Sequence, residues 1–276
     1  MTNERLGNMP GLMQGKRGLV MGVANDHSIA WGIAKMLHEQ GAELAFTYQG
    51  EALGKRVKPL AESVGSLIVM PCDVEDIATV DAVFDKVKSA WGKMDFLVHA
   101  VAFSDKNELK GRYADSTREN FIRTMVISCY AFTEAAKRAA ALMPDGGAML
   151  TLTYNGGDRA MPNYNVMGVA KAALESSVRY LAVDFGGRNI RVNAISAGPV
   201  RTLAGAGITD ARAMFAFQQQ YSPLGRGITL EEMGGAGLYL LSDLSSGVTG
   251  EIHFVDSGYN VIAMPHPEAL KATGQG

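Results

Sequence analysis

The sequence predicts an α/β fold of the Rossmann type, in which a doubly wound, seven-stranded parallel sheet lies between two layers of helices. Short apolar runs typical of buried strands alternate with amphipathic segments of helical period. The 32 glycines are scattered between these runs, as expected for tight strand-to-helix turns. Because no Pro- or Ser-rich linker divides the 276 residues, we predict a single domain over 1–276, with a substrate-binding flap at about 199–221.

The first 50 residues contain a complete β-α-β unit. Arg17–Met21 is an apolar run typical of a buried strand, and Glu43–Tyr48 is a second. Between them, apolar residues of 29–37 recur at helical spacing, and Gly41 is suited to end that helix. The turn that joins the first strand to this helix is therefore a candidate ligand site.

The same alternation continues along the rest of the chain. We expect further strands at Leu67–Met70, Phe96–Ala100, Ala148–Thr153, Ile190–Ile195 and Glu251–Val255, with helices over 51–64, 80–91, 118–142, 174–185 and within 199–246. In doubly wound sheets, ligands bind beyond the carboxyl ends of the strands. Five residues lie at or just after such ends and predict a site there: Gly22, Asp73, Val101, Tyr154 and Ala197.

Composition argues against several classes of protein. A net charge of −2 without a basic run disfavours nucleic-acid binding. No apolar run reaches the roughly 18 residues of a membrane span, and the N-terminal segment has no apolar core of a secretory signal. Cys72 and Cys129 are too few for a disulfide framework and lack metal-ligand spacing. We therefore expect a cytoplasmic protein that binds no metal.

The segment Thr151–Lys171 holds the candidate catalytic residues Tyr154, Tyr164 and Lys171. A phenol has a pKa of about 10 in water and becomes a better hydrogen-bond and proton donor beside a fixed cation. Tyr164 and Lys171 are seven residues apart, which returns to nearly the same face of a helix. Taken alone, such a pair more often belongs to a solvated helix surface than to a catalytic site, so its interpretation depends on the surrounding chain.

The turn after the first predicted strand is where a dinucleotide pyrophosphate meets a helix N-terminus. Its spacing departs from the usual G-x-G-x-x-G, because Gly22 is followed by no glycine until Gly32. Ser28 is suited to cap the helix and to donate to a phosphate, although a structural cap alone is the alternative. Gln49, after the second strand, offers a hydrogen bond to the adenosine ribose but no charge for a 2′-phosphate, which favours NADH over NADPH.

Four segments carry a resemblance to a known family: GVANDHSIAWGIA at 22–34, CDV at 72–74, PNYNVMGVAKAALE at 162–175 and RVNAISAGPVRTLA at 191–204. In this order they resemble the bacterial enoyl-[acyl-carrier-protein] reductases of type II fatty-acid synthesis. Those enzymes are a divergent branch of the short-chain dehydrogenase/reductase superfamily. The resemblance extends over about 15–265, nearly the whole chain.

Two departures from ordinary short-chain dehydrogenases favour this narrower branch. Those enzymes carry Tyr-x-x-x-Lys, whereas the residue four after Tyr164 is Gly168. They also carry Asn-Ala-Gly after the fourth strand, where this chain has Ala100, Val101 and Ala102. Ala102 is a departure from the reductases themselves, in which glycine is common. We expect it to narrow the floor beside the nicotinamide without preventing hydride transfer.

The resemblance implies roles for individual positions. Residues implied to hold NADH are Gly22, Ser28 and Ile29 at the pyrophosphate, Gln49, Asp73 and Val74 at the adenosine, and Val101, Lys171, Val200, Arg201, Thr202, Leu203 and Ala204 toward the nicotinamide. Tyr154, Tyr164 and Lys171 are implied as catalytic, and Ser104 and Met214 as substrate contacts together with both tyrosines. An acyl-carrier protein is the implied partner, and a homotetramer is the implied assembly.

The implied reaction is the NADH-dependent reduction of trans-2-enoyl-acyl-carrier-protein thioesters to saturated acyl thioesters. Tyr164 would stabilise the enolate oxygen, Lys171 would position the cofactor, and Tyr154 would assist protonation or guide the substrate. A carbonyl or hydroxysteroid-type dehydrogenase is the second hypothesis, and the absence of Tyr-x-x-x-Lys argues against it. A catalytically inactive nucleotide-sensing module is the third, and the retention of Tyr164 and Lys171 argues against that.

Residues 203–221 combine small side chains with later large apolar ones. This composition suits a mobile flap over an acyl chain. An amphipathic helix buried in a subunit contact is the alternative.

Overall fold

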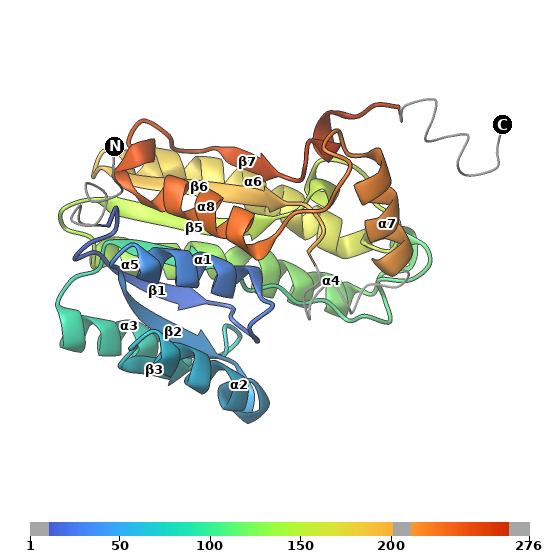
Figure 1. Cartoon of the computed structure of the whole chain (residues 1–276). Coiled ribbons are helices and arrows are strands. Elements are labelled where there is room, and N and C mark those ends of the chain that lie inside the picture. The colour runs from blue at the N-terminus through green and yellow to red at the C-terminus, as the bar shows by residue number, and fades with distance from the viewer. Residues whose placement is uncertain (1–10, 201–210, 265–276) are drawn as a thin grey trace, which may run out of the picture.

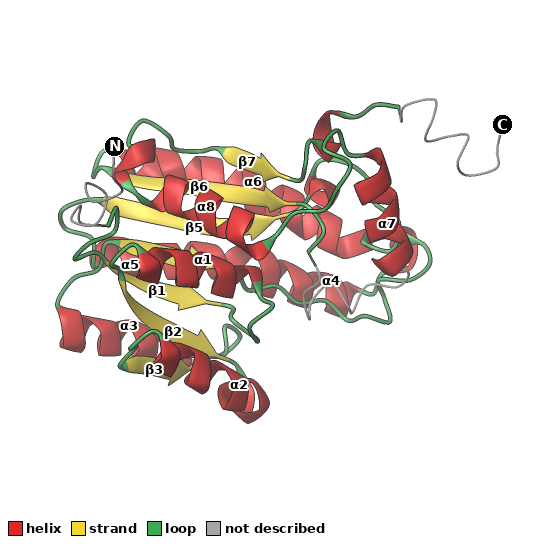
Figure 2. Ribbon diagram, viewed as in Figure 1, coloured by secondary structure: helices red, strands yellow, loops and turns green. Residues whose placement is uncertain are grey.

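A computed structural model of the protein describes residues 11–200 and 211–264, which form three layers with a sheet in the middle (Figures 1 and 2). The sheet has seven strands in the order β3-β2-β1-β4-β5-β6-β7, and every neighbouring pair is parallel. The strands are β1 (Arg17–Met21), β2 (Glu43–Tyr48), β3 (Ile68–Pro71), β4 (Phe96–His99), β5 (Gly147–Thr153), β6 (Ile190–Ala197) and β7 (Ile252–Val255). The predicted fold class is confirmed.

Helices cover both faces of the sheet. One face packs against α1 (Ile29–Glu39), α2 (Gly50–Ser63) and α8 (Leu230–Leu241), and the other against α3 (Ile77–Trp91), α5 (Ala131–Ala141) and α6 (Asn165–Gly186). Successive residues of a strand point to opposite faces. Within β1, Leu19 and Met21 accordingly belong to the core beneath α3, α5 and α6, whereas Val20 belongs to the core beneath α1, α2 and α8.

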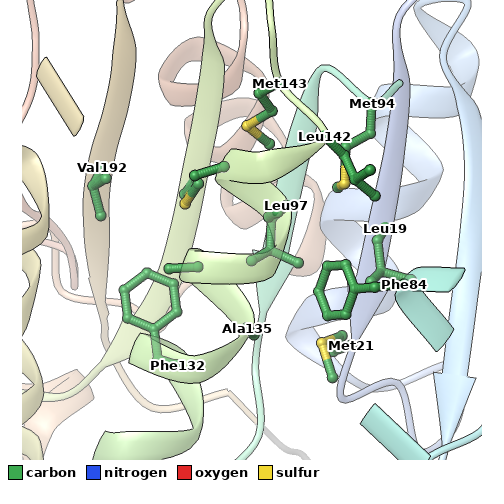
Figure 3. Close-up of a cluster of buried hydrophobic side chains, with 14 of the residues drawn as sticks. Leu19, Met21, Phe84, Met94, Leu97, Phe132, Ala135, Leu142, Met143 and Val192 are labelled. Atoms are coloured by element: carbon green, nitrogen blue, oxygen red, sulfur yellow. The ribbon is translucent and has the colours of Figure 1, made fainter. Parts of the chain in front are cut away.

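Figure 3 shows the core beneath α3 and α5, where Leu19, Phe84 and Leu97 lie together. Leu19 and Leu97 are completely buried, as is Phe132 of α5. Burying a side chain of this size contributes about 1.5–3 kcal/mol relative to leaving it exposed. These contacts fix the strands, and the strands in turn fix the loops that follow their carboxyl ends.

The remaining helices are α4 (Arg118–Met125) and α7 (Ala211–Tyr221), with short 3₁₀ turns at Tyr113–Asp115, Asn155–Gly157, Asp243–Ser245 and Tyr259–Val261. The single helix predicted over 118–142 is interrupted by a π-helical turn, Val126–Tyr130. This turn holds the buried Ser128, whose hydroxyl bonds both the backbone N–H and the carbonyl of Phe103 at 3.0 Å. Such turns are frequent at functional sites.

The other element boundaries differ from the predictions by only a few residues, except at the start of α6. That helix begins at Asn165, nine residues before the predicted start. A smaller difference concerns β3, because Leu67 lies outside this strand and is 91% exposed.

The order of the strands creates a switch point between β1 and β4. The chain moves outward from β1 to β2 and β3, then returns to β4 on the other side and continues to β7. The loops after β1 and β4 therefore diverge and leave a crevice at the carboxyl edge. Within residues 11–200 and 211–264, no helix is long and apolar enough to cross a bilayer, and no cluster of metal-ligating side chains is present.

Candidate active site

A pocket of about 470 Å³ opens at this switch point, beyond the carboxyl ends of β1, β2, β3 and β4. We call it the switch-point pocket. Five of the residues predicted to hold the cofactor line it: Gly22, Gln49, Asp73, Val74 and Val101. The structure thus brings together side chains and backbone from four separate loops.

Gly22 ends β1 in a conformation that other residues rarely adopt, with φ at 100°. A Cβ added at this position would lie 2.2 Å from the carbonyl oxygen of Ala100, at the end of the neighbouring β4. The two strand ends therefore touch through bare backbone. This close approach leaves no room for a side chain at position 22 of the pocket lining.

The predicted helix cap by Ser28 is wrong in its detail. Ser28 occupies the N-cap position of α1, but its side chain makes no bond to the helix. Its hydroxyl instead turns back into the loop, where it accepts hydrogen bonds from the N–H groups of Ala24 at 3.0 Å and Asn25 at 3.1 Å. Ser28 thereby shapes the loop that lines the pocket, while Ile29 begins α1 and packs against the core.

Gln49 and Asp73, the residues predicted to meet the adenosine, lie together in the switch-point pocket. Gln49 Nε2 donates to Asp73 Oδ2 at 3.1 Å, joining the loops after β2 and β3. The other carboxylate oxygen of Asp73 accepts from the N–H of Glu75 at 3.0 Å. Thr79 stabilises the same loop, because its hydroxyl accepts from the N–H of Asp73 at 2.9 Å.

Tyr154 and Tyr164 lie together beyond β5. Tyr154 directly follows that strand, and Tyr164 directly precedes α6. Their rings meet edge to face, with centroids 5.0 Å apart and planes inclined by 70°. Tyr164 is 8% exposed, and burial raises its pKa well above the usual range of a phenol. Tyr154 is only partly buried, and burial raises the pKa of its phenol as well.

Lys171 is buried on α6, one helical turn beyond the residues that pack on Tyr164. Its Nζ donates to the carbonyl of Leu152 on β5 at 2.7 Å. Burial lowers the pKa of Lys171 to about 8. Burial has the largest effect on the pKa of Tyr164, so its phenol is neutral and keeps its O–H at neutral pH.

Comparison with known proteins identifies the family to which this chain belongs. The model of the family described as Enoyl-(Acyl carrier protein) reductase matches residues 22–260, most of the chain. This chain belongs to the enoyl-[acyl-carrier-protein] reductase family. It is 74% identical over 263 residues to enoyl-[acyl-carrier-protein] reductase [NADH] 2 of Rhizobium meliloti, covering 95% of this chain and 98% of that relative.

Solved structures of the reductase family share the fold. A crystal structure of FabI from Candidatus Liberibacter asiaticus has a TM-score of 0.91 and 61% identity, covering 94% of this chain and 100% of that one. The Anaplasma phagocytophilum reductase, solved in complex with NAD, has a TM-score of 0.90 and 57% identity, covering 94% and 98%. The family resemblance inferred from the four motifs is confirmed.

The structure describes only some of the other predicted site residues of this reductase. The hydroxyl of Ser104, after β4, accepts from Thr124 Oγ1 at 2.9 Å and from Asn120 Nδ2 at 3.2 Å. Met214 lies half-buried on α7, and Val200 packs against the core. Arg201, Thr202, Leu203 and Ala204 lie outside the described residues.

Three contacts of the reductase site were not predicted. Gln218 of α7 donates from Nε2 to the hydroxyl of Tyr154 at 2.6 Å. Its signal in the sequence is its position four residues after Met214 and three before Tyr221, on one face of a helix. Arg123 lies 4.6 Å over the ring of Phe103 and pairs with Glu75 at 2.8 Å, all three lining the switch-point pocket. A single arginine on a helix gives no comparable signal.

Proposed function

We propose that the protein catalyses the NADH-dependent reduction of trans-2-enoyl-acyl-carrier-protein thioesters to saturated acyl thioesters, the reductive step that ends each elongation cycle of type II fatty-acid synthesis. The observation that carries this proposal is the edge-to-face pair of Tyr154 and Tyr164 beyond the end of β5 in a member of this family, with the buried Lys171 seven residues after Tyr164 and hydrogen-bonded to the same strand. Relatives named for this activity with NADH support it.

The residues present fit a nicotinamide dinucleotide. The floor at Gly22 has no room for a Cβ, which lets a pyrophosphate approach the backbone near the start of α1. Gln49 and Asp73 offer hydrogen bonds to an adenosine ribose, and Lys171 offers an ammonium group to the ribose of the nicotinamide. Ser28, Ile29, Val74, Val101 and the segment Val200, Arg201, Thr202, Leu203 and Ala204 complete the proposed cofactor contacts.

Nicotinamide, when bound, supplies the hydride that the enoyl carbon receives. Tyr164 donates a hydrogen bond to the thioester oxygen, on which negative charge develops as the substrate accepts that hydride. A high pKa suits this role, because the phenol stays protonated and its O–H stays available. Lys171 holds the ribose and keeps positive charge near the developing anion.

Tyr154 contributes from the mouth of the site. It is only partly buried, and it supports Tyr164 through the edge-to-face contact of their rings. We assign it a second hydrogen bond to the substrate or assistance to protonation. Ser104 and Met214 are proposed to contact the acyl group, with residues 199–221 as the flap over it.

NADH is the proposed cofactor in preference to NADPH. Gln49 and Asp73, at the adenosine end, present an amide and a carboxylate where a 2′-phosphate would require a cation. The structural relative from Anaplasma phagocytophilum was solved with NAD, in agreement with this choice.

An acyl-carrier protein is the proposed source of the substrate, and a homotetramer acting in the cytoplasm is the proposed form of the enzyme. Tyr180 and Val183 project from one side of α6 with 73% and 81% of their surface exposed, which suits contact with a second copy. Both cysteines are free and buried, as suits a reducing compartment. Light scattering should give four times the 29.4 kDa of one chain.

The deciding experiment measures NADH oxidation with a trans-2-enoyl thioester, a ketone and no substrate. Turnover with the thioester alone is expected. Tyr164→Phe should lower kcat by about 10²-fold, the order expected when one oxyanion donor is lost. Turnover of that variant at the wild-type rate would remove Tyr164 from the mechanism, and reduction of the ketone would favour a carbonyl dehydrogenase.

A further inference from the structure

Gln218 is an almost completely buried amide on α7, with 2% of its surface exposed. Its Nε2 donates to the hydroxyl of Tyr154 across 64 residues of sequence, at 2.6 Å. Its Oε1 is buried and has no partner among the described residues. A buried amide costs about 1–3 kcal/mol unless it is hydrogen-bonded. The bond to Tyr154 therefore compensates the burial of the amide nitrogen, but not that of Oε1.

The bond joins two parts of the molecule that the core does not connect. Figure 1 shows α7 beyond the tips of the strands. Tyr154, by contrast, directly follows β5 and packs on Tyr164. The position of α7 thus determines which groups the phenol of Tyr154 meets.

We propose that Gln218 is a positioning residue, which fixes the hydroxyl of Tyr154 as a hydrogen-bond donor toward the acyl substrate. The proposal rests on the role assigned to Tyr154 in the proposed function. A phenol has one O–H donor and can also accept. Because the amide N–H occupies an acceptor position on the side of α7, the O–H turns away from α7 and remains free to donate to a ligand.

The same contact tunes the acidity of Tyr154. Burial raises the pKa of the phenol, and the hydrogen bond from Gln218 opposes that rise. Since the donor is carried by α7, the phenol is oriented and tuned only when α7 lies over it. Placing α7 over the phenol therefore also orients the O–H of Tyr154 and sets its pKa.

A double-mutant cycle tests the inference in the full-length enzyme. Gln218→Met keeps the length of the side chain but removes the amide, and should lower kcat about tenfold, the equivalent of 1.4 kcal/mol, with an unchanged KM for NADH. In a Tyr154→Phe background the same substitution should cause no further loss. The matched control is Gln219→Met, at the exposed neighbouring position, which should turn over like the wild type.

The pH profile provides a readout that a merely structural role would not move. Where ionisation of Tyr154 makes kcat fall in alkali, loss of the amide donor should move this fall to higher pH. The reason is that the hydrogen bond that lowers the pKa of Tyr154 is gone. Gln218→Glu is the second variant, and remains informative if Gln218→Met does not fold. Its ionised carboxylate would accept the phenolic hydrogen, so activity should fall at neutral pH and recover on acidification.

Four results separate the role proposed for Tyr154 from the inference about Gln218. Wild-type turnover in Tyr154→Phe would overturn the role of Tyr154 itself. Impaired Tyr154→Phe with unimpaired Gln218→Met would overturn the inference about Gln218 alone, as would additive losses in the double variant. Faster turnover in Gln218→Met would overturn it too, because the phenol would then donate to the amide in the wild type.

Discussion

The side-chain amide of Gln49 and the carboxylate of Asp73 are joined by a hydrogen bond of 3.1 Å in the switch-point pocket, at the carboxyl ends of β2 and β3. The bond fixes a negative charge beside the position proposed for the adenosine ribose. A 2′-phosphate placed there would be repelled, whereas two ribose hydroxyls would find an acceptor. We therefore expect the pair to act on cofactor choice in two ways, by attracting the ribose hydroxyls and by repelling a 2′-phosphate.

Asp73→Asn is expected to weaken the preference for NADH over NADPH. The substitution removes the charge, while the new amide oxygen can still accept from Gln49. Loss of one such repulsion near the surface is worth about 1 kcal/mol, or roughly fivefold in the ratio of kcat/KM values for the two cofactors. Steady-state kinetics with both cofactors measure this ratio. Asp85→Asn, on the exposed side of α3, is the control, and an unchanged ratio in Asp73→Asn would contradict the prediction.

Local sequence patterns predicted the sheet because each strand carries its own signal. Arg17–Met21 and Glu43–Tyr48 were predicted with the bounds that the structure shows, since apolar character and glycine turns mark both ends. Ser28 could be placed at a helix start but not oriented, because its hydroxyl chooses between the helix and the loop according to how the loop folds. That choice depends on contacts no local pattern encodes.

Gly22→Ala tests the backbone contact at the floor of the pocket. A Cβ 2.2 Å from the carbonyl oxygen of Ala100 cannot be accommodated without moving β1 or β4, and φ at 100° adds strain. We expect a loss of at least about 2 kcal/mol in the free energy of unfolding, together with weaker NADH binding. Urea denaturation and fluorescence titration measure the two effects.

Gly235→Ala is the matched control for that variant. It lies on the exposed side of α8, where an added Cβ meets nothing within 4 Å. Alanine is a better helix former than glycine, so stability should rise by up to about 1 kcal/mol. A Gly22→Ala protein as stable as the wild type would show that the strand ends do not touch as described.

Lys171 predicts an alkaline limit to cofactor use. Burial lowers its pKa to about 8, so the ammonium group loses its proton as the pH rises through that value. The charged form, which we expect to hold the ribose, is present below this pH. The kcat/KM for NADH, which reports the free enzyme, should therefore fall between pH 7 and 9.5. Lys171→Arg should keep the value constant over this range, and a constant wild-type value would exclude the role.

The candidate site was predicted in its parts and not in its connections. Tyr154, Tyr164 and Lys171 were recognised through the order of the four motifs, because their residue types and spacing alone are typical of a solvated helix surface. Gln218 is joined to Tyr154 by a contact between a helix and a strand end 64 residues apart, and glutamine is common on helix surfaces. Only the folded chain shows that this glutamine points inward.

His99 predicts a loss of stability in acid. It is the last residue of β4, its ring lies 5.5 Å from that of Phe132, and both ring nitrogens are buried without a partner among the described residues. Burial, aided by the charge of Lys171, lowers the pKa of this imidazole to about 3. The folded protein therefore keeps His99 neutral, while the unfolded chain takes up a proton near the ordinary pKa of about 6.5.

Between pH 6.5 and 3 the unfolded state binds more protons at this position than the folded state, so the free energy of unfolding falls as the pH falls. One such group contributes about 1.4 kcal/mol per pH unit. His99→Gln, which cannot titrate, should be less stable at pH 7 but should lose stability more slowly between pH 6.5 and 4.5. The control is His38→Gln in the last turn of α1, where the side chain is exposed and the wild-type slope should remain. Urea denaturation at four pH values gives, for each protein, the slope of the free energy of unfolding against pH. Equal slopes for His99→Gln and the wild type would show that folding does not lower the pKa of His99.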